Sequence, residues 1–308
     1  MLRLLTHSAP WQLLFLGLRY AVLASAWSLA SDCTSNDAVK VNEAMPNAIA
    51  MADYATKRAA QDPGRYPRKG NLLQDMLGAS DENDANALSL ARQWFGAARD
   101  AASGNVVIHC SDSYLSTIDA DTGVYRDNTR PGTFGTPRVQ IPRSNDGGWT
   151  SNACGGHLRA FAYSFEGGKV IVLCSDSDSG ALRAPKWNSL DSFRTGGAFL
   201  AENLSAIGIN IFQQFLSYMI LHELMHVADD RQFPGKLPDG GGELYSYEYI
   251  TGHAVGATGA GGPSANDRQH NADSYALLAC GWYCPRVGYV NGRGRQIKEA
   301  DRPPLDLR

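Results

Sequence analysis

The sequence has little charge and no concentrated positive charge. Only 19% of its 308 residues are charged, the formal net charge is −3, and no block of lysine and arginine is dense enough to bind a phosphate backbone. Nucleic acid is therefore not an expected partner. The chain also lacks a long apolar run after residue 30. A membrane-spanning helix is excluded there, because a span needs about 20 nearly uncharged residues.

No C-x-x-C pair occurs among the six cysteines, which argues against a zinc site made of thiolates. An even number of cysteines in an exported chain instead predicts disulfide bonds. We therefore expect three bridges among Cys33, Cys110, Cys154, Cys174, Cys280 and Cys284.

The first thirty residues, 1–30, have the pattern of a secretory signal peptide. Arg3 provides a positive start, residues 13–24 are mostly apolar, and small residues follow. Cleavage after Ala26 or Ala30 fits this pattern. Charge within the apolar stretch argues more strongly against a membrane span than against a signal. We expect a secreted, extracellular protein that is a monomer and has no membrane partner.

Hydrophobic patterning predicts one domain over residues 31–290, followed by a poorly ordered polar tail over 291–308. Pro46 disturbs the first of the helical patterns. The predicted helices cover 39–61, 82–102, 209–229 and a stretch that begins at Asn266 or Asn271 and ends near Cys280. The predicted strands cover 106–110, 139–141, 157–165 and 170–174. This mixture predicts an α+β fold.

Residues 222–226 read H-E-L-M-H and form the H-E-x-x-H pattern inside a predicted helix. Because His222 and His226 are four residues apart, they share one helical face, and both imidazoles can reach one Zn2+ at about 2.0–2.1 Å. The carboxylate of Glu223 then lies beside the metal. There it can take a proton from a zinc-bound water whose pKa the metal lowers to about 7. This chemistry is typical of peptide hydrolases.

Short patterns also arise by chance, and a histidine on an apolar face is more often a core residue than a metal ligand. The surrounding residues favour the metal, since the helix is otherwise strongly apolar. Three ionisable side chains are costly to bury in such a helix without a partner such as a metal ion. A catalytic zinc needs three protein ligands and one open position, so a further ligand must come from downstream.

The third ligand does not follow the metzincin pattern H-E-x-x-H-x-x-G-x-x-H. Asp229 and Gln232 occupy the positions of its glycine and its last histidine. The remaining candidates are His253, His270 and Asp273. Only the last two lie in a predicted helix that can pack against the helix of the H-E-x-x-H pattern.

Residues 271–277 read N-A-D-S-Y-A-L and closely resemble the N-A-D-[ST]-Y-A-L segment of the aspzincins, the deuterolysin-like fungal metallopeptidases. The resemblance covers about residues 90–285 and implies a zincin-like fold with Glu223 as the general base. The ligands that it implies for one Zn2+ are His222, His226 and Asp273. His270, three residues before Asp273, stays an alternative ligand or a donor that orients Asp273.

A second block of the same family, a cysteine, a short strand and another cysteine, resembles Cys154, residues 162–164 and Cys174. The resemblance implies two disulfide pairs, and a third follows only by elimination. The three pairs are Cys154–Cys174, Cys33–Cys110 and, by elimination, Cys280–Cys284.

The aspzincins also carry G-T-x-x-D-x-x-Y-G between the zinc segments, with a tyrosine thought to support the transition state. This chain departs from that pattern, since residues 240–247 read G-G-G-E-L-Y-S-Y. With Glu243 in place of the aspartate, the tyrosine position falls on Ser246. One inserted residue brings Tyr247 into place, with Tyr245 as the alternative, and its hydroxyl would donate to the developing oxyanion. The other interpretation is a tyrosine-lined loop without a catalytic role.

The sequence thus predicts a secreted zinc endopeptidase with a zincin-like α+β fold and a protein or peptide substrate. Its small twisted sheet is expected to be mostly antiparallel, with an edge strand that can hold an extended peptide. One alternative is a gluzincin-like peptidase with Glu243 or Glu248 as the third ligand. The other is a secreted zinc-binding protein that keeps the fold without hydrolysis. Glu223 disfavours the second alternative, because zinc binding alone does not need it.

Overall fold

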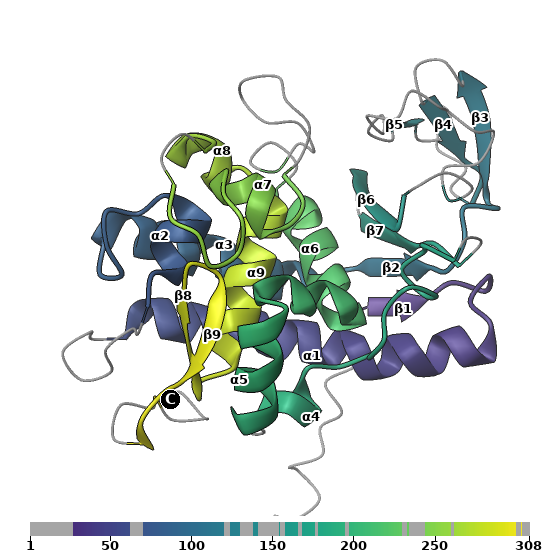
Figure 1. The fold of residues 1–308 in the computed structure, drawn as a ribbon. Helices are drawn as coiled ribbons and strands as arrows, with labels where there is room; N and C mark the ends of the chain where they lie inside the picture. Colours follow the sequence, from purple (N-terminus) through teal and green to yellow (C-terminus); the bar gives the residue numbers. More distant parts are fainter. Residues whose placement is uncertain are drawn as a thin grey trace, which may run out of the picture.

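A computed structural model of the chain has an α+β architecture. The strands of the largest sheet gather at one end of the molecule and most helices lie at the other, with the long helix α1 (Ser35–Ala60) running beneath both (Figure 1). The structure describes residues 27–61, 70–119, 124–129, 138–140, 154, 158–165, 168–175, 178–194, 197–229, 233, 244–259, 262–299 and 303.

Four helices that pack on one another form the main hydrophobic core. They are α1, α3 (Ala85–Ala102), α6 (Leu216–Ala228) and α9 (Ala272–Tyr283). Pro46 lies inside α1 and does not end it, contrary to the disturbance expected from the sequence. The reason is tertiary packing: Met45 and Ala48 beside the proline are fully buried, and this contact offsets the hydrogen bond that proline cannot make.

Shorter helices connect this core to the loops around it. They are α2 (Leu72–Leu77), α4 (Asp191–Arg194), α5 (Gly197–Ala206), the 3-10 helix η2 (Ile209–Gln214), α7 (Tyr247–Thr251) and α8 (Ala265–Gln269). Within the described residues, no helix is long and apolar enough to cross a bilayer.

The helix expected over 209–229 is divided in two. Phe215 has an extended backbone with φ −108° and ψ 131°, and it separates η2 from α6. The interruption arises because Phe215 forms a bridge with Trp187, and the amide of Leu216 donates to the carbonyl of Trp187. The helix that carries H-E-x-x-H therefore begins only at Leu216.

The largest sheet is mixed, and the expectation of a mostly antiparallel sheet is wrong. Its strands follow the order β1-β2-β7-β6, in which β1 with β2 and β2 with β7 are parallel and only β6 with β7 is antiparallel. The physical reason is connectivity, because parallel neighbours need a long connection: α1 and α3 lie between β1 and β2, and residues 110–167 lie between β2 and β7. The bounds are β1 (Trp27–Leu29), β2 (Val106–His109), β6 (Ala160–Phe165) and β7 (Gly168–Leu173).

Strand β1 bears on the predicted signal peptide. Cleavage after Ala26 would leave β1 in the mature chain, whereas cleavage after Ala30 would remove a strand that pairs with β2. Residues 1–26 lie outside the described residues, so the signal peptide itself stays a prediction.

Two smaller antiparallel sheets complete the fold. They consist of β3 (Leu115–Asp119), β4 (Val124–Asp127) and β5 (Arg138–Gln140), and of β8 (Val287–Val290) and β9 (Arg293–Gln296). The second pair corrects the expectation of a poorly ordered tail from residue 291. Asn291 and Gly292 both have positive φ, 50° and 72°, as a tight two-residue hairpin requires. This Asn-Gly signal was present in the sequence.

Two of the three expected disulfides are confirmed, Cys33–Cys110 and Cys154–Cys174. The third is wrong, because Cys280 and Cys284 are free and buried. Residues four apart on a helix have Cβ atoms about 5–6 Å apart, whereas a disulfide needs about 3.5–4.5 Å. Burial raises the pKa of both thiols, so both stay protonated.

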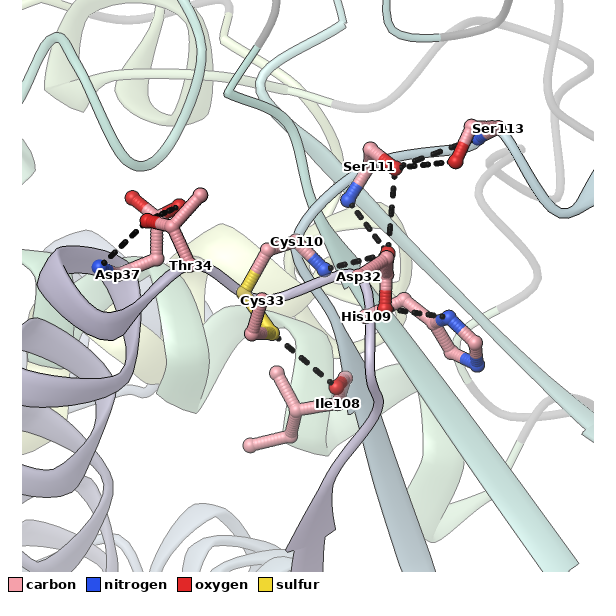
Figure 2. Close-up of a disulfide and its surroundings, with 9 residues drawn as sticks. All are labelled: Asp32, Cys33, Thr34, Asp37, Ile108, His109, Cys110, Ser111 and Ser113. Atoms are coloured by element: carbon pink, nitrogen blue, oxygen red, sulfur yellow. Dashed lines mark hydrogen bonds and ion pairs between the residues drawn. A yellow bond between two sulfur atoms is a disulfide. The ribbon is translucent and has the colours of Figure 1, made fainter.

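The carboxylate of Asp32 ties the first disulfide to the end of β2 (Figure 2). Its Oδ2 accepts the amides of Cys110 and Ser111 at 3.1 and 3.0 Å. Its Oδ1 lies 3.1 Å from Nδ1 of His109. Burial opposes ionisation, but the hydrogen bonds from His109 and Ser111 outweigh it and lower the pKa of Asp32. Asp32 thus holds the carboxyl end of β2 as an anion.

Candidate metal centre

The two histidines of H-E-x-x-H face one another on α6. Their Nε2 atoms are 3.2 Å apart, and His222 is only 6% exposed. Two nitrogens bound tetrahedrally to one Zn2+ at about 2.0–2.1 Å would lie about 3.3–3.4 Å apart. The spacing of the two imidazoles therefore fits a shared zinc ion.

The outer nitrogen of each ring already has a partner. Nδ1 of His226 lies 2.8 Å from the carbonyl oxygen of Phe233, and Nδ1 of His222 lies 3.1 Å from Oδ1 of Asp273. A carbonyl oxygen can only accept, and Oδ1 of Asp273 also accepts the hydroxyl of Tyr218, so we assign the proton of each ring to Nδ1. In the neutral rings both Nε2 atoms then present lone pairs to one another. Such an arrangement is stable with a cation bound to both nitrogens, or with one ring doubly protonated.

Asp273, a predicted zinc ligand, lies beside His222 and contacts its outer ring nitrogen. Its Oδ1 meets Nδ1 of His222, on the side of the ring away from Nε2. The same oxygen accepts the hydroxyl of Tyr218, while Oδ2 accepts the amide of Ser246 at 2.9 Å and Nε2 of Gln213 at 3.4 Å. A carboxylate that contacts the outer nitrogen of an imidazole in this way can fix the orientation of the ring.

Asp273 belongs to the first turn of α9, where the helix dipole favours a negative charge. It is 1% exposed, so its oxygens depend on protein donors for their hydrogen bonds. Burial, followed by the charge of Asp273, raises the pKa of Tyr218 well above its usual value. Tyr218 therefore keeps its proton and stays a donor to Asp273.

Tyr247 does not lie at the site, which corrects the first choice for the tyrosine. It is fully buried, and its hydroxyl donates to Oδ2 of Asp75 at 2.9 Å. Burial raises the pKa of both groups. The alternative, Tyr245, is 53% exposed and stacks on His222 with ring centroids 5.8 Å apart. The structure thus places Tyr247 in the core and Tyr245 beside the imidazoles.

The other candidate ligands lie elsewhere or outside the described residues. Nδ1 of His270 meets the carbonyl of Asn266, and Nδ1 of His253 meets that of Thr251. Glu248 accepts from Asn210 and Ser246. Glu243 lies outside the described residues. Within the part of the chain that the structure describes, no third histidine, cysteine or acidic residue completes a metal cluster.

Asn271 was expected from the sequence only to begin a helix, but its side chain also belongs to the site. It makes no capping hydrogen bond; instead Oδ1 accepts the amide of Leu244 and Nδ2 donates to the carbonyl of Leu244, each at 3.0 Å. Together with the bond from the Ser246 amide to Asp273, this pair clamps the segment 244–246 to α9. The clamp presents Tyr245 to His222. In the sequence, the N-A-D segment at residues 271–273 was the signal that could have identified Asn271 as a site residue.

Glu223 follows His222 on α6 and is 5% exposed. Its side chain is therefore buried within the mostly apolar helix α6. The arrangement of His222, Glu223 and His226 can bind a cation and move a proton.

Comparisons with known proteins add no relative. No protein-family model, no curated protein and no solved structure matches this chain. The resemblance to the aspzincins therefore stays a prediction that depends on the two short segments.

Proposed function

We propose that this protein is a secreted zinc-dependent endopeptidase of the aspzincin-like class, with Zn2+ held by Nε2 of His222 and of His226. The observation that carries the proposal is the 3.2 Å approach of these two nitrogens, each on a ring whose Nδ1 donates elsewhere. Protonation of one ring is the competing account. It gives no reason for Glu223 to follow His222, whereas metal-assisted hydrolysis does.

When bound, the ion would lower the pKa of a water to about 7 and polarise the scissile carbonyl. Glu223 would accept the proton of the attacking water and deliver it to the leaving amine. Asp273 would fix the ring of His222 with Nε2 directed inward, in place of the ligand role expected from the resemblance. Tyr245, not Tyr247, would donate its hydroxyl to the oxyanion.

The third ligand is left open by the described residues. The gluzincin-like alternative loses support for Glu248, because Asn210 and Ser246 hold its carboxylate. Its other candidate, Glu243, lies outside the described residues. Water, substrate or such a residue would fill the remaining positions of the ion.

The surroundings of α6 support an extended protein or peptide substrate. Strand β6 is the last strand of the mixed sheet and packs against α6. An edge strand can pair with the backbone of a bound peptide. The proposed zincin-like fold consists of this edge strand and the H-E-x-x-H helix beside it. The two disulfides support export, since such bonds persist in oxidising compartments.

Zinc stoichiometry and peptide hydrolysis, measured together, test the proposal. The wild-type chain should bind one Zn2+, and its hydrolysis of casein should stop with a chelator and return with zinc. The variant Glu223→Gln should keep the ion and lose about 100-fold or more of the activity. His222→Ala should lose both the ion and the activity.

Three outcomes would count against the proposal in different ways. A wild-type chain without stoichiometric zinc would favour a protonated histidine pair. Zinc binding without hydrolysis would favour the secreted zinc-binding protein. Full activity in Glu223→Gln would remove Glu223 from the mechanism.

A further inference from the structure

We infer that Tyr218 is a positioning residue of the zinc site, acting on His222 through Asp273. The inference rests on the proposed function, since it concerns how firmly the two imidazoles hold the ion. Tyr218 was not distinguished by any motif. Its role follows from the hydrogen bond that its hydroxyl donates to Asp273.

Tyr218, His222 and His226 occur every four residues along α6, so they share one face of the helix. The hydroxyl of Tyr218 donates to Oδ1 of Asp273, which is also the oxygen that accepts Nδ1 of His222. One carboxylate oxygen therefore joins a tyrosine and an imidazole from successive turns of the same helix. All three groups are buried.

The other carboxylate oxygen is held from different directions. Oδ2 of Asp273 accepts from the amide of Ser246 and from Gln213, neither of which belongs to α6. Besides His222 itself, Tyr218 is the donor of α6 that holds Oδ1 in place. Without it, the carboxylate can pivot about its contacts at Oδ2, and the ring of His222 loses its fixed orientation. Outer partners of ligating histidines affect metal affinity by about 10–100-fold.

The variant Tyr218→Phe tests this role because it removes only the hydroxyl. Its dissociation constant for Zn2+ should rise about 10-fold, at the lower end of that range. Transfer of zinc to an excess of chelator should accelerate by a similar factor. The visible spectrum of the Co2+-loaded variant should differ from that of wild type, because the imidazole geometry changes. These readouts do not depend on hydrolysis.

Tyr275→Phe is the matched control. Tyr275 is also fully buried, and within the described residues its hydroxyl has no hydrogen-bond partner. Removing this hydroxyl should leave the zinc affinity and the release rate unchanged. A general effect of losing a buried hydroxyl would change both variants alike.

A double-mutant cycle with Asp273→Asn separates positioning from a loss of stability. If Tyr218 acts through Asp273, then Tyr218→Phe should have little further effect on zinc affinity in the Asp273→Asn background. Equal or tighter zinc binding by Tyr218→Phe, or fully additive effects in the cycle, would overturn the inference. Failure of the proposed function is a separate result, because the wild-type chain itself would then hold no zinc at His222 and His226.

Discussion

Helix α9 and its C-cap residue contain two free, buried cysteines, whereas strands β2 and β7 lead into cysteines that are cross-linked. The helices α1, α3, α6 and α9 share one large apolar cluster. On the outer side of β6 and β7 the second apolar cluster has only six buried members within the described residues. A region that buries little apolar surface gains most from covalent cross-links.

The buried charges of the two regions differ in the same way. Asp273, in the helical region, is 1% exposed and is surrounded by side-chain and backbone donors. Asp32, beside the first disulfide, has a side chain that is 17% exposed and holds mainly the backbone of β2 (Figure 2). The candidate metal centre therefore depends on a noncovalent network, whereas the carboxyl ends of β2 and β7 depend on disulfides.

Removal of the first disulfide should give the largest effect on stability. Cys33→Ala/Cys110→Ala opens a link between residues 77 apart, and chain entropy predicts a loss of about 4.5 kcal/mol in the free energy of unfolding. Cys154→Ala/Cys174→Ala, with a separation of 20, should lose about 3 kcal/mol. Urea denaturation measures both. Zinc affinity of the folded variants should stay at the wild-type value, and its loss would break the separation of the two regions.

Replacement of Asp273, unlike removal of a disulfide, should lower the zinc affinity as well as the stability. Asp273→Ala leaves Tyr218, His222 and the amide of Ser246 without their acceptor, which should lower the free energy of unfolding by about 3 kcal/mol. Zinc affinity should fall about 10–100-fold.

The control for this prediction is Asp267→Asn, which weakens only the capping box of α8. It should lose about 1 kcal/mol without any change in zinc affinity. An Asp273→Ala chain that binds zinc as tightly as wild type would show that the network does not support the site.

Loss of the Asn271 clamp should have a smaller effect. Asn271→Ala removes two hydrogen bonds to the backbone of Leu244, which predicts a loss of about 2 kcal/mol. Hydrogen exchange of the Leu244 amide should accelerate, and peptide hydrolysis should fall because Tyr245 is no longer held beside His222. The exposed Asn266→Ala is the control and should change neither. Unchanged exchange at Leu244 would refute the clamp.

The smallest effect should come from replacing Asp32, which changes how stability depends on pH in acid. The pKa of Asp32 is lowered in the folded state, so its contribution to stability is present above the ordinary pKa of about 4. It is lost as the pH falls through the lower, folded pKa. Asp32→Asn should therefore make unfolding less dependent on pH below about 4, as acid titration of circular dichroism would show. If stability below pH 4 were the same in Asp32→Asn as in wild type, ionised Asp32 would not be what holds the carboxyl end of β2.

Local patterns predicted much of the fold. The helix over 82–102 is present as α3, and the apolar β segments at 106–110 and 170–174 are present as β2 and β7. The failures have tertiary causes. Phe215 breaks an apolar helix because it pairs with Trp187, a partner distant in the chain that periodicity cannot reveal. The parallel pairing of β2 with β7 likewise depends on how the intervening segments cross the sheet.

The sequence likewise predicted only part of the candidate site. Its two histidines could be placed from the sequence, whereas the loop around Tyr245 and Tyr247 could not. The hydrogen bonds from Tyr247 to Asp75 and from Leu244 to Asn271, which the sequence does not reveal, decide which tyrosine faces the histidines. The resemblance implied that Asp273 lies near the histidines as a zinc ligand, whereas its contact with Nδ1 of His222 is visible only in the structure.

The sequence by itself determined that His222 and His226 share one face of a helix and that Glu223 follows His222, because helical periodicity depends only on neighbouring residues. Only the tertiary structure decided that Asp273 supports His222 from behind, that Tyr218 holds Asp273, and that Tyr245 lies over the ring. These contacts join residues of α6, α9 and the loop before α7, and their geometry depends on how the helices pack. Packing is a property of the whole core, which no short stretch of sequence contains.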